Sequence, residues 1–320
     1  MRKIVLIGGG TGLSTFARVL KSFPVDLTLV VAITDDGGSS GILREEMKIP
    51  PPGDIRNNII ALANNEEILT KVFSHRFSTD AMKKHSLGNI IIAGLTEMYG
   101  SFPDAVIAAS KLLNIKGKVL PVADALVRLI GELDDGSKIE GESEVARYGK
   151  KIKRLTLDRK VQALPEVLRE IEMADTLIVG PGSLFTSVVP NFLVSGVSEA
   201  FSRSPGKKVY ICNIMTQPKE SEGFDLKKHV DTVESYIGTT FDRVFWTEVG
   251  GVEKTVLERY RRAGAVPVRN DLPDDTRVTV IRGATTELII DGREKLVVRH
   301  SRESIVSILR ELEILEEILL

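Results

Sequence analysis

The glycine-rich stretch Gly8-Gly9-Gly10-Thr11-Gly12 has a composition suited to binding phosphate. It follows an apolar run at residues 4–7 and precedes a predicted helix at residues 13–21. Glycines allow a sharp turn and let a ligand approach the main chain. The free N–H groups and the dipole at the start of a helix favour an anion. We therefore predict a phosphate site that includes Gly9, Gly10, Thr11 and Gly12; a turn without a ligand is the alternative.

This loop differs from the fingerprint of NAD-binding proteins. Read from Gly8, the pattern G-x-G leads to Leu13 where a third glycine is required, and read from Gly10 it leads to Thr15. That third glycine permits close packing of helix on strand in dinucleotide-binding folds. NAD is therefore not the expected ligand.

A second loop, residues 35–40, carries two carboxylates after a predicted strand at residues 27–34. Asp35 and Asp36 could bind ribose or sugar hydroxyls, or they could hold a hydrated Mg²⁺ that bridges phosphates. We favour binding of hydroxyls by Asp36 and expect no metal, because a regulatory protein that binds a ligand without a reaction needs no metal for chemistry. A solvated turn is the alternative. The candidate binding residues of this loop are Asp35, Asp36, Gly37, Gly38, Ser39 and Ser40.

Polar residues at other element ends add candidates. Asp54 is placed to cap a predicted helix at residues 55–63, and Arg56 stands in its first turn, where a phosphate would offset the unfavourable helix dipole. Residues 180–187 repeat the phosphate-cradle pattern after a predicted strand at residues 175–179. The further candidates for ligand contacts are Asn57, Asn89, Gly182, Ser183, Thr186, Asn213 and Thr216.

Nucleophilic catalysis of the hydrolase type has little support in the sequence. Residues 37–41 match G-x-S-x-G, but no histidine stands in a recognisable partner motif. The four histidines lack metal-ligand spacing, and no C-x-x-C pair or P-loop occurs. We therefore assign neither a catalytic residue nor a metal site.

The predicted elements alternate in a way that indicates an α/β, Rossmann-like, doubly wound and mostly parallel sheet. We expect residues 1–320 to form one domain, with a small β-rich excursion at about 117–157 and a C-terminal helix at about 302–319. The apolar stripe of that helix is either core or a dimer seam, and core is favoured.

Because the loops at 8–12, 35–41 and 180–187 each follow a predicted parallel strand, they should meet at one edge of the sheet. Predicted strands lie at 3–7, 27–34, 119–122, 152–157, 175–179, 208–214, 243–247, 278–281, 287–290 and 295–299, and predicted helices at 13–21, 55–63, 66–75, 87–98, 104–113, 165–173 and 226–237.

The composition narrows the class of protein. Forty-three basic and 44 acidic residues give a net charge of −1, which argues against a general nucleic-acid binder. No apolar run is long enough for a membrane span, and none resembles a signal peptide. The single cysteine, Cys212, lies in a predicted buried strand, so we expect no disulfide and a cytoplasmic location.

One basic run has no role in these motifs. It consists of Arg147, Lys150, Lys151, Lys153 and Arg154. Such runs are usually solvated, although this one could face an anionic ligand.

Taken together, the motifs resemble the YvcK family of gluconeogenesis factors. The stretches that carry the resemblance are residues 8–12, 35–41, 52–57, 88–89, 180–187 and 213–218, and the similarity extends from residue 3 to about residue 260. The wider superfamily resembles CofD, the 2-phospho-L-lactate transferase that makes a deazaflavin coenzyme precursor.

The resemblance implies a Rossmann-like fold, a cytoplasmic location and binding of UDP-sugars such as UDP-N-acetylglucosamine. It also implies a role in growth on gluconeogenic carbon sources, in cell shape and in cell-wall synthesis. Members of this branch have no settled reaction. A nucleotide-sugar-binding regulator is therefore the leading hypothesis, and a Mg²⁺-dependent transferase of a phosphorylated group is the alternative. A homodimer and a downstream regulatory protein partner stay open.

Overall fold

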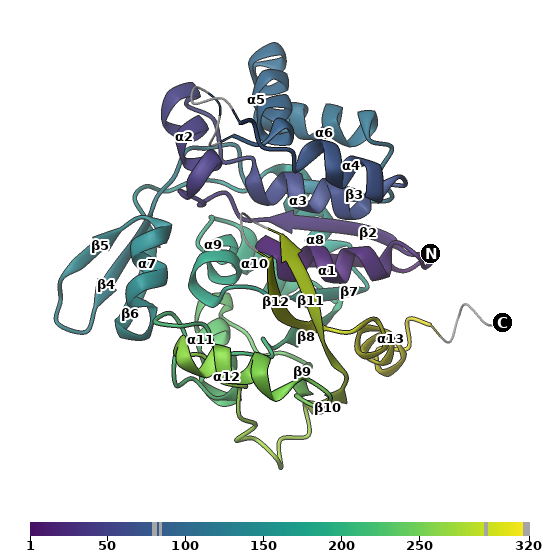
Figure 1. Ribbon diagram of the computed structural model, residues 1–320, viewed down its shortest axis with the longest axis vertical. Helices are drawn as coiled ribbons and strands as arrows, with labels where there is room; N and C mark the ends of the chain where they lie inside the picture. Colours follow the sequence, from purple (N-terminus) through teal and green to yellow (C-terminus); the bar gives the residue numbers. More distant parts are fainter. Residues whose placement is uncertain (79–81, 83–84, 291–293, 316–320) are drawn as a thin grey trace.

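The computed structural model describes residues 1–320 except 79–81, 83–84, 291–293 and 316–320. Its centre is a seven-stranded sheet in the order β10-β9-β8-β7-β1-β2-β3, and every pair of neighbouring strands in it is parallel (Figure 1). The predicted doubly wound α/β fold is thus confirmed. The strands are β1 (Lys3–Gly8), β2 (Asp26–Val31), β3 (Lys118–Pro121), β7 (Thr176–Val179), β8 (Lys207–Ile211), β9 (Arg243–Glu248) and β10 (Val278–Arg282).

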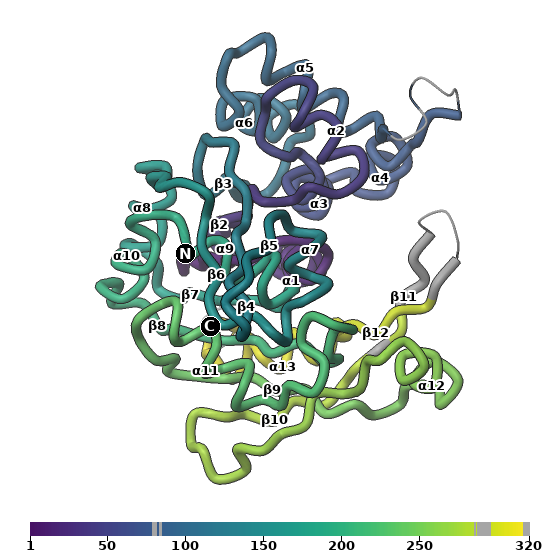
Figure 2. The backbone as a smooth tube through the Cα atoms, turned by 90° about the vertical axis from the view of Figure 1, so that its left-hand side faces the viewer, coloured from purple at the N-terminus to yellow at the C-terminus, as the bar shows by residue number. Residues whose placement is uncertain are grey.

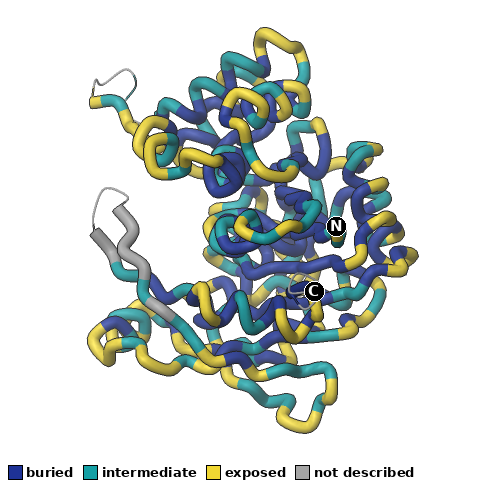
Figure 3. The backbone as a smooth tube through the Cα atoms, turned by 90° about the vertical axis from the view of Figure 1, so that its right-hand side faces the viewer, coloured by how far each residue is buried: buried dark blue, intermediate teal, exposed yellow. Residues whose placement is uncertain are grey.

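Helices cover both faces of this sheet because successive side chains of a strand point to opposite sides. In β1, Ile4 and Leu6 belong to one apolar core, whereas Val5 and Ile7 belong to the other. The first core includes side chains of α1 (Gly10–Leu20), α3 (Gly53–Leu62), α6 (Phe102–Leu112) and α13 (Arg302–Glu311). The second includes side chains of α8 (Pro165–Glu172), α9 (Val189–Phe192), α10 (Val197–Arg203) and α11 (Leu226–Ile237). Buried strands and exposed outer helix surfaces are visible in Figure 3.

The order of the strands reverses between β1 and β7. From β1 the chain continues to β2 and β3 on one side, and β7 to β10 extend the sheet on the other side. At such a reversal the loops after the two strands diverge, which leaves a crevice outside their carboxyl ends. The loops at residues 9–12 and 180–187 flank this crevice.

A group of helices lies above β2 and β3 in Figure 1. It contains α2 (Gly38–Met47), α4 (Glu66–Phe73) and α5 (Leu87–Tyr99), together with α3 and α6. Helix α2 was not predicted, because two glycines and two serines at its start are typical of a loop. Gly37 precedes it in an extended conformation, and Ser39 and Ser40 are buried.

The β-rich excursion is shorter than predicted. Strand β3 is part of the central sheet, where it pairs with β2, so the region 117–121 does not belong to the excursion. The small antiparallel sheet has the order β5-β4-β6. It consists of β4 (Leu129–Leu133), β5 (Lys138–Glu140) and β6 (Ile152–Leu157), with helix α7 (Glu142–Tyr148) and the turn η1 (Gly149–Lys151) between β5 and β6.

The C-terminal helix ends earlier than the predicted 302–319. Helix α13 stops at Glu311, and residues 312–315 form a turn in which Glu313 has a φ of 59° and Ile314 N–H bonds to the Leu309 carbonyl at 2.9 Å. Residues 316–319 of the prediction lie outside the described residues. The apolar stripe is core as expected, because Ile305, Ile308 and Leu309 are fully buried.

Before α13 the chain forms α12 (Lys254–Arg262) and an antiparallel hairpin of β11 (Ala284–Ile290) and β12 (Glu294–His300). Figure 2 shows the hairpin beside α12, projecting away from the central sheet. Within the described part of the chain, no helix is long and apolar enough to cross a membrane.

Candidate functional site

The loops after β1, β7 and β8 line one pocket of about 310 Å³. Of the three loops predicted to meet, those at 8–12 and 180–187 line it together, whereas the loop at 35–41 contributes no residue to its lining. The pocket lies at the crevice where the strand order reverses. Its walls contain Gly9, Gly10, Thr11, Gly12, Gly182, Ser183, Asn213 and Thr216 from the predicted set, and also Pro181, Ser187 and Gln217. We refer to it as the crevice pocket.

Two glycines shape the first loop for different reasons. Gly10 has a φ of +64°, a conformation that other residues adopt only with strain. Gly12 has no room for a side chain, because a Cβ atom there would lie 2.4 Å from the Pro181 carbonyl oxygen. We expected these glycines to admit a ligand, but the need for glycine at position 12 comes from the packing of two loops against each other.

Asn213 and Thr216 fix backbone in this pocket. The Asn213 amide accepts a bond from Gly182 N–H at 3.0 Å and donates one to the Gly182 carbonyl at 2.7 Å. The Thr216 hydroxyl accepts from Val266 N–H at 3.0 Å. The loops after β7 and β8 are therefore held in one arrangement.

The second predicted phosphate cradle is occupied by the protein itself. Glu220 is buried, accepts from the Ser183 hydroxyl at 2.5 Å and accepts from Phe185 N–H at 2.8 Å. Thr186 is bonded to the same Ser183 hydroxyl at 2.5 Å. This carboxylate thus accepts the hydrogen bonds of the hydroxyl and N–H groups at the start of the η2 turn (Leu184–Val188). Burial raises the pKa of Glu220. Sequence spacing did not identify Glu220.

Asp54 does not cap its own helix as predicted. Helix α3 begins at Gly53 after Pro52 and has no side-chain cap, because Asp54 instead accepts from Gly10 N–H at 2.7 Å. The carboxylate therefore takes one of the N–H groups at the start of α1. Burial, followed by the charge of Asp35, raises the pKa of Asp54 to about 6.

Three carboxylates meet beside the first loop. Glu142 at the start of α7 lies close enough to Asp35 to share a hydrogen bond with it, and burial followed by the charges of Asp35 and Asp54 raises the pKa of Glu142 well above its ordinary value. Sequence analysis did not identify Glu142, because it lies in a region predicted to be β-rich. Such a wall repels a bare phosphate and favours groups that donate hydrogen bonds, such as sugar hydroxyls.

Asp35 and Asp36 do not act as a pair. The Asp35 carboxylate accepts from Gly37 N–H at 2.9 Å. Asp36 points to α7, where it accepts from Ser143 N–H at 3.1 Å and from the Ser143 hydroxyl at 2.7 Å. Among the described residues, no group of three or more His, Cys, Asp or Glu side chains has the geometry of a metal site.

The remaining candidates form a polar network between α2, α3 and α5. The Arg56 guanidinium donates to Asn89 at 3.0 Å and to Asn57 at 2.9 Å. It also bonds Ser86, the cap of α5. The Asn89 amide donates to Ser39 at 3.0 Å, and Ser40 accepts from Gly53 N–H at 3.1 Å. These residues lie outside the crevice pocket, and their contacts with one another fix the helices at the carboxyl end of β2.

The C-terminal hairpin supplies pocket residues that local sequence patterns did not indicate. Arg299 on β12 donates to the Thr11 hydroxyl at 2.9 Å. Val298, His300 and Tyr260 of α12 line the pocket beside it. His300 is buried and bonds the Thr247 hydroxyl at 3.2 Å, and burial lowers the pKa of His300 to about 4. The pocket thus has a guanidinium next to the N-terminus of α1, which is an arrangement suited to an anion.

Comparison with known proteins shows the family to which the chain belongs. Residues 4–287 match the family model described as 2-phospho-L-lactate transferase CofD. The chain is 42% identical over 315 residues to the gluconeogenesis factor of Bacillus subtilis, covering 97% of this chain and 98% of that protein. It is 44% identical over 310 residues to a Thermotoga maritima relative, covering 96% and 98%.

A crystal structure of a Bacillus halodurans protein has the same fold. It superposes with a TM-score of 0.88 at 40% identity and covers 97% of this chain and all of that one. The chain therefore belongs to the CofD family, in the YvcK branch whose curated members are named gluconeogenesis factors.

Proposed function

We propose that this protein is a regulatory protein that binds a UDP-sugar of the UDP-N-acetylglucosamine type in the crevice pocket. The observation that carries the proposal is the meeting of Arg299 with the glycine loop at Thr11, 2.9 Å apart. A guanidinium and a helix N-terminus together favour a diphosphate. The C-terminal hairpin and the first glycine loop, which are far apart in the sequence, meet at this hydrogen bond. Neither segment needs this contact to form its own secondary structure.

The charged groups around the crevice determine how the ligand would be oriented. The diphosphate would lie at Thr11 and Gly12 beside Arg299, because Asp54 already takes the Gly10 N–H and Glu220 already takes the Ser183 hydroxyl proton. Sugar or ribose hydroxyls would lie toward Asp54, Asp35 and Glu142, because carboxyl oxygens accept hydrogen bonds from hydroxyls and the negative charge that this group of carboxyls holds repels phosphate. Tyr260 on α12 provides an aromatic surface at the pocket wall for the uracil or the sugar.

The family suggests the biological setting of this binding. The Bacillus subtilis relative is named a gluconeogenesis factor. We propose that this protein likewise supports growth on gluconeogenic carbon sources, cell shape and cell-wall synthesis, acting in the cytoplasm through a downstream protein partner. A homodimer is compatible with this role.

The alternative function is transfer of a phosphorylated group between a nucleotide and an acceptor, as the name of the matching family model describes. A Mg²⁺ ion would then supply charge neutralisation at the phosphates. The carboxylates of Asp35, Asp54 and Glu142 are the groups nearest to that task, but Asp36, the second expected metal ligand, is bonded to Ser143. The same bonds also occupy Asp36 for the sugar hydroxyls that we expected it to bind, so Asp36 does not separate the two functions, and the regulator is preferred on the contact of Arg299 with Thr11.

Calorimetric titration tests both readings. UDP-N-acetylglucosamine, GDP, GTP and NAD are titrated into the wild-type protein, each with and without a chelator. We expect binding of the UDP-sugar that survives chelation and is much weaker in Arg299→Gln. Arg302→Gln is the matched control, since Arg302 is exposed and is the first residue of α13.

The outcomes separate the two functions. Binding of the UDP-sugar without turnover, and independent of Mg²⁺, supports a regulator. Conversion of a nucleotide substrate that requires Mg²⁺ supports the transferase. If Arg299→Gln binds each of the four compounds as the wild-type protein does, the crevice pocket is not the nucleotide site.

A further inference from the structure

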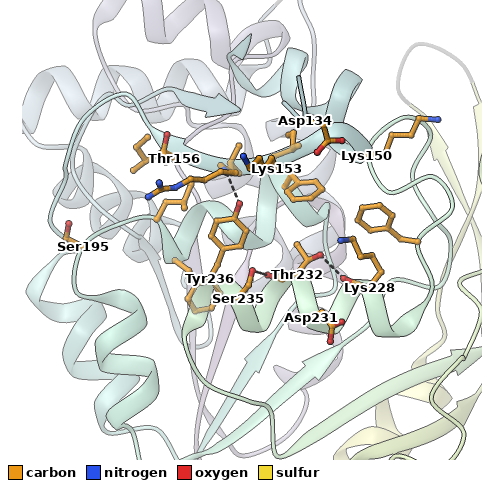
Figure 4. A pocket seen from close by; sticks show the side chains of 18 of the residues that line it. Asp134, Lys150, Lys153, Thr156, Ser195, Lys228, Asp231, Thr232, Ser235 and Tyr236 are labelled. Carbon is orange, nitrogen blue, oxygen red and sulfur yellow. Dashed lines mark hydrogen bonds between the residues drawn. The ribbon is translucent and has the colours of Figure 1, made fainter. Parts of the chain in front are cut away.

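A groove of about 1000 Å³ lies between β6 and α11, and its lining shares no residue with the crevice pocket. One wall is strand β6 and the segment that follows it, and the other wall is α11. Figure 4 shows Lys153 and Thr156 on the first wall facing Lys228, Thr232 and Tyr236 on the second. We refer to it as the β6–α11 groove.

The groove concentrates positive charge. Among the described residues its lining contains six basic and two acidic side chains, whereas the whole chain has a net charge of −1. Lys150 pairs with Glu222 at 3.0 Å and Lys153 with Glu132 at 3.8 Å. One of the two lining carboxylates, Asp231, is already paired with Lys227 at 2.5 Å.

The other four cations of the lining are Arg154, Arg159, Lys160 and Lys228. Within the described part of the chain, no ion pair joins any of them to a carboxylate. All four are exposed at the rim. Arg154, Arg159 and Lys160 lie on the β6 wall and Lys228 on the α11 wall, so an anionic occupant between the walls would meet positive charge from both sides that no carboxylate of the described chain pairs with.

The floor of the groove is apolar and aromatic. Phe185 and Phe192 are buried beneath it, and Phe224 and Tyr236 are partly exposed. The Lys228 ammonium lies 5.6 Å from the centre of the Phe224 ring. A free inorganic anion would use the rim but leave this floor in water. An occupant with both apolar and acidic groups would use both, as in the apolar centre and polar rim of protein interfaces.

Strand β6 is at the edge of its sheet, and its open edge faces the groove. In the order β5-β4-β6 it has β4 as its neighbour. Its Leu155 N–H points away from β4 and donates to the Tyr236 hydroxyl at 2.7 Å. The backbone groups of Leu157, two residues further along the strand, point to the same side. Because Tyr236 takes the Leu155 N–H, an extended chain that lies along this edge would bond to the other backbone groups on that side, such as those of Leu157.

We propose that the β6–α11 groove binds an extended segment of a partner protein that carries alternating acidic and apolar residues. Strand β6 has six residues and at about 3.3 Å per residue offers a track of roughly 20 Å. Acidic side chains of the segment would meet the four rim cations, and its apolar side chains would pack on the aromatic floor. This proposal does not depend on the identity of the ligand in the crevice pocket.

The test uses fluorescence anisotropy with a labelled eight-residue peptide in which Glu alternates with Leu and Phe. Two further peptides carry Gln or Lys in place of every Glu. The full-length wild-type protein is compared with Arg154→Glu/Lys228→Glu and with Arg159→Glu/Lys160→Glu, so that the test remains decisive if one double variant fails to fold. The matched control is Lys111→Glu/Lys254→Glu, which makes the same charge change at exposed positions outside the groove.

We expect the Glu peptide to bind the wild-type protein and the control, to bind each groove variant at least about tenfold more weakly, and to lose affinity as salt rises. The Gln and Lys peptides should bind more weakly than the Glu peptide. The proposal is overturned if the wild-type protein does not bind the Glu peptide, or if the groove variants bind it as well as the control. Binding of tripolyphosphate that the groove variants abolish, without binding of the peptide, would identify a small-anion site instead.

Discussion

Arg299 and Thr11 stand 288 positions apart in the sequence, yet the Arg299 guanidinium donates to the Thr11 hydroxyl at 2.9 Å. The bond joins the C-terminal hairpin to the first glycine loop. It brings a fixed positive charge to the N-terminus of α1, where the helix dipole acts in the same direction. The hairpin is therefore part of the candidate site, although it lies outside the central sheet.

We predict that Arg299→Gln weakens binding of a UDP-sugar by about 10- to 100-fold. Hydrogen bonds to a charged group contribute roughly 1.5–3 kcal/mol, and each 1.4 kcal/mol corresponds to a factor of ten. Calorimetry measures the change, and Arg302→Gln should bind as the wild type does. Equal loss in both variants would indicate a general effect of charge and not a contact with the ligand.

The raised pKa of Asp54 makes stability depend on pH. In the folded protein this carboxyl has a pKa of about 6, against an ordinary value of 3.8. At a pH between 3.8 and about 6, the folded state therefore keeps a proton on Asp54 that the unfolded state has lost. The free energy of unfolding accordingly falls as the pH rises through this interval.

Asp54→Asn should remove this dependence while it keeps an acceptor for Gly10 N–H. We expect the variant to match the wild type near pH 4 and to be more stable by about 1–3 kcal/mol near pH 8. Urea denaturation at the two pH values measures the difference. The buried His300 titrates in both proteins and cancels in the comparison. Parallel pH profiles would contradict the assignment.

Gly12→Ala should destabilise the protein by about 1–3 kcal/mol, which is typical of overpacking. The added Cβ would lie 2.4 Å from the Pro181 carbonyl oxygen, so the two loops must separate. Gly94→Ala in α5 is the matched control, because its Cβ would meet no atom within 4 Å and alanine favours a helix. Thermal denaturation should rank Gly94→Ala at or above the wild type and Gly12→Ala below it. An unchanged midpoint in Gly12→Ala would show that the loops yield without cost.

Leu312→Ala should cost about 2–5 kcal/mol, as large-to-small core substitutions do. Leu312 is 1% exposed and packs in the core that α1 and α3 share with α13. Leu112→Ala on α6 makes the same chemical change at a side chain that is 71% exposed, and it should cost little. Denaturation in urea compares the two. Dissociation of an oligomer without unfolding in Leu312→Ala would instead place this side chain in a subunit interface.

Periodicity and turn chemistry in the sequence determined the α/β class and most elements. Buried parallel strands have nearly continuous apolar runs, and this is why residues 3–7 and 175–179 were identified within one or two residues. The meeting of the loops after β1 and β7 also followed from the sequence, since carboxyl ends of parallel strands share one edge.

Only the tertiary structure decided what those loops touch. Glu220 fills the cradle at Ser183, Asp36 turns to Ser143, and Asp54 bonds Gly10 instead of its own helix. The entry of Arg299 into the pocket was likewise absent from the local pattern. The physical reason is that a side chain's partner is set by which segments pack together in three dimensions, whereas sequence periodicity reports only the local backbone state and which face is apolar.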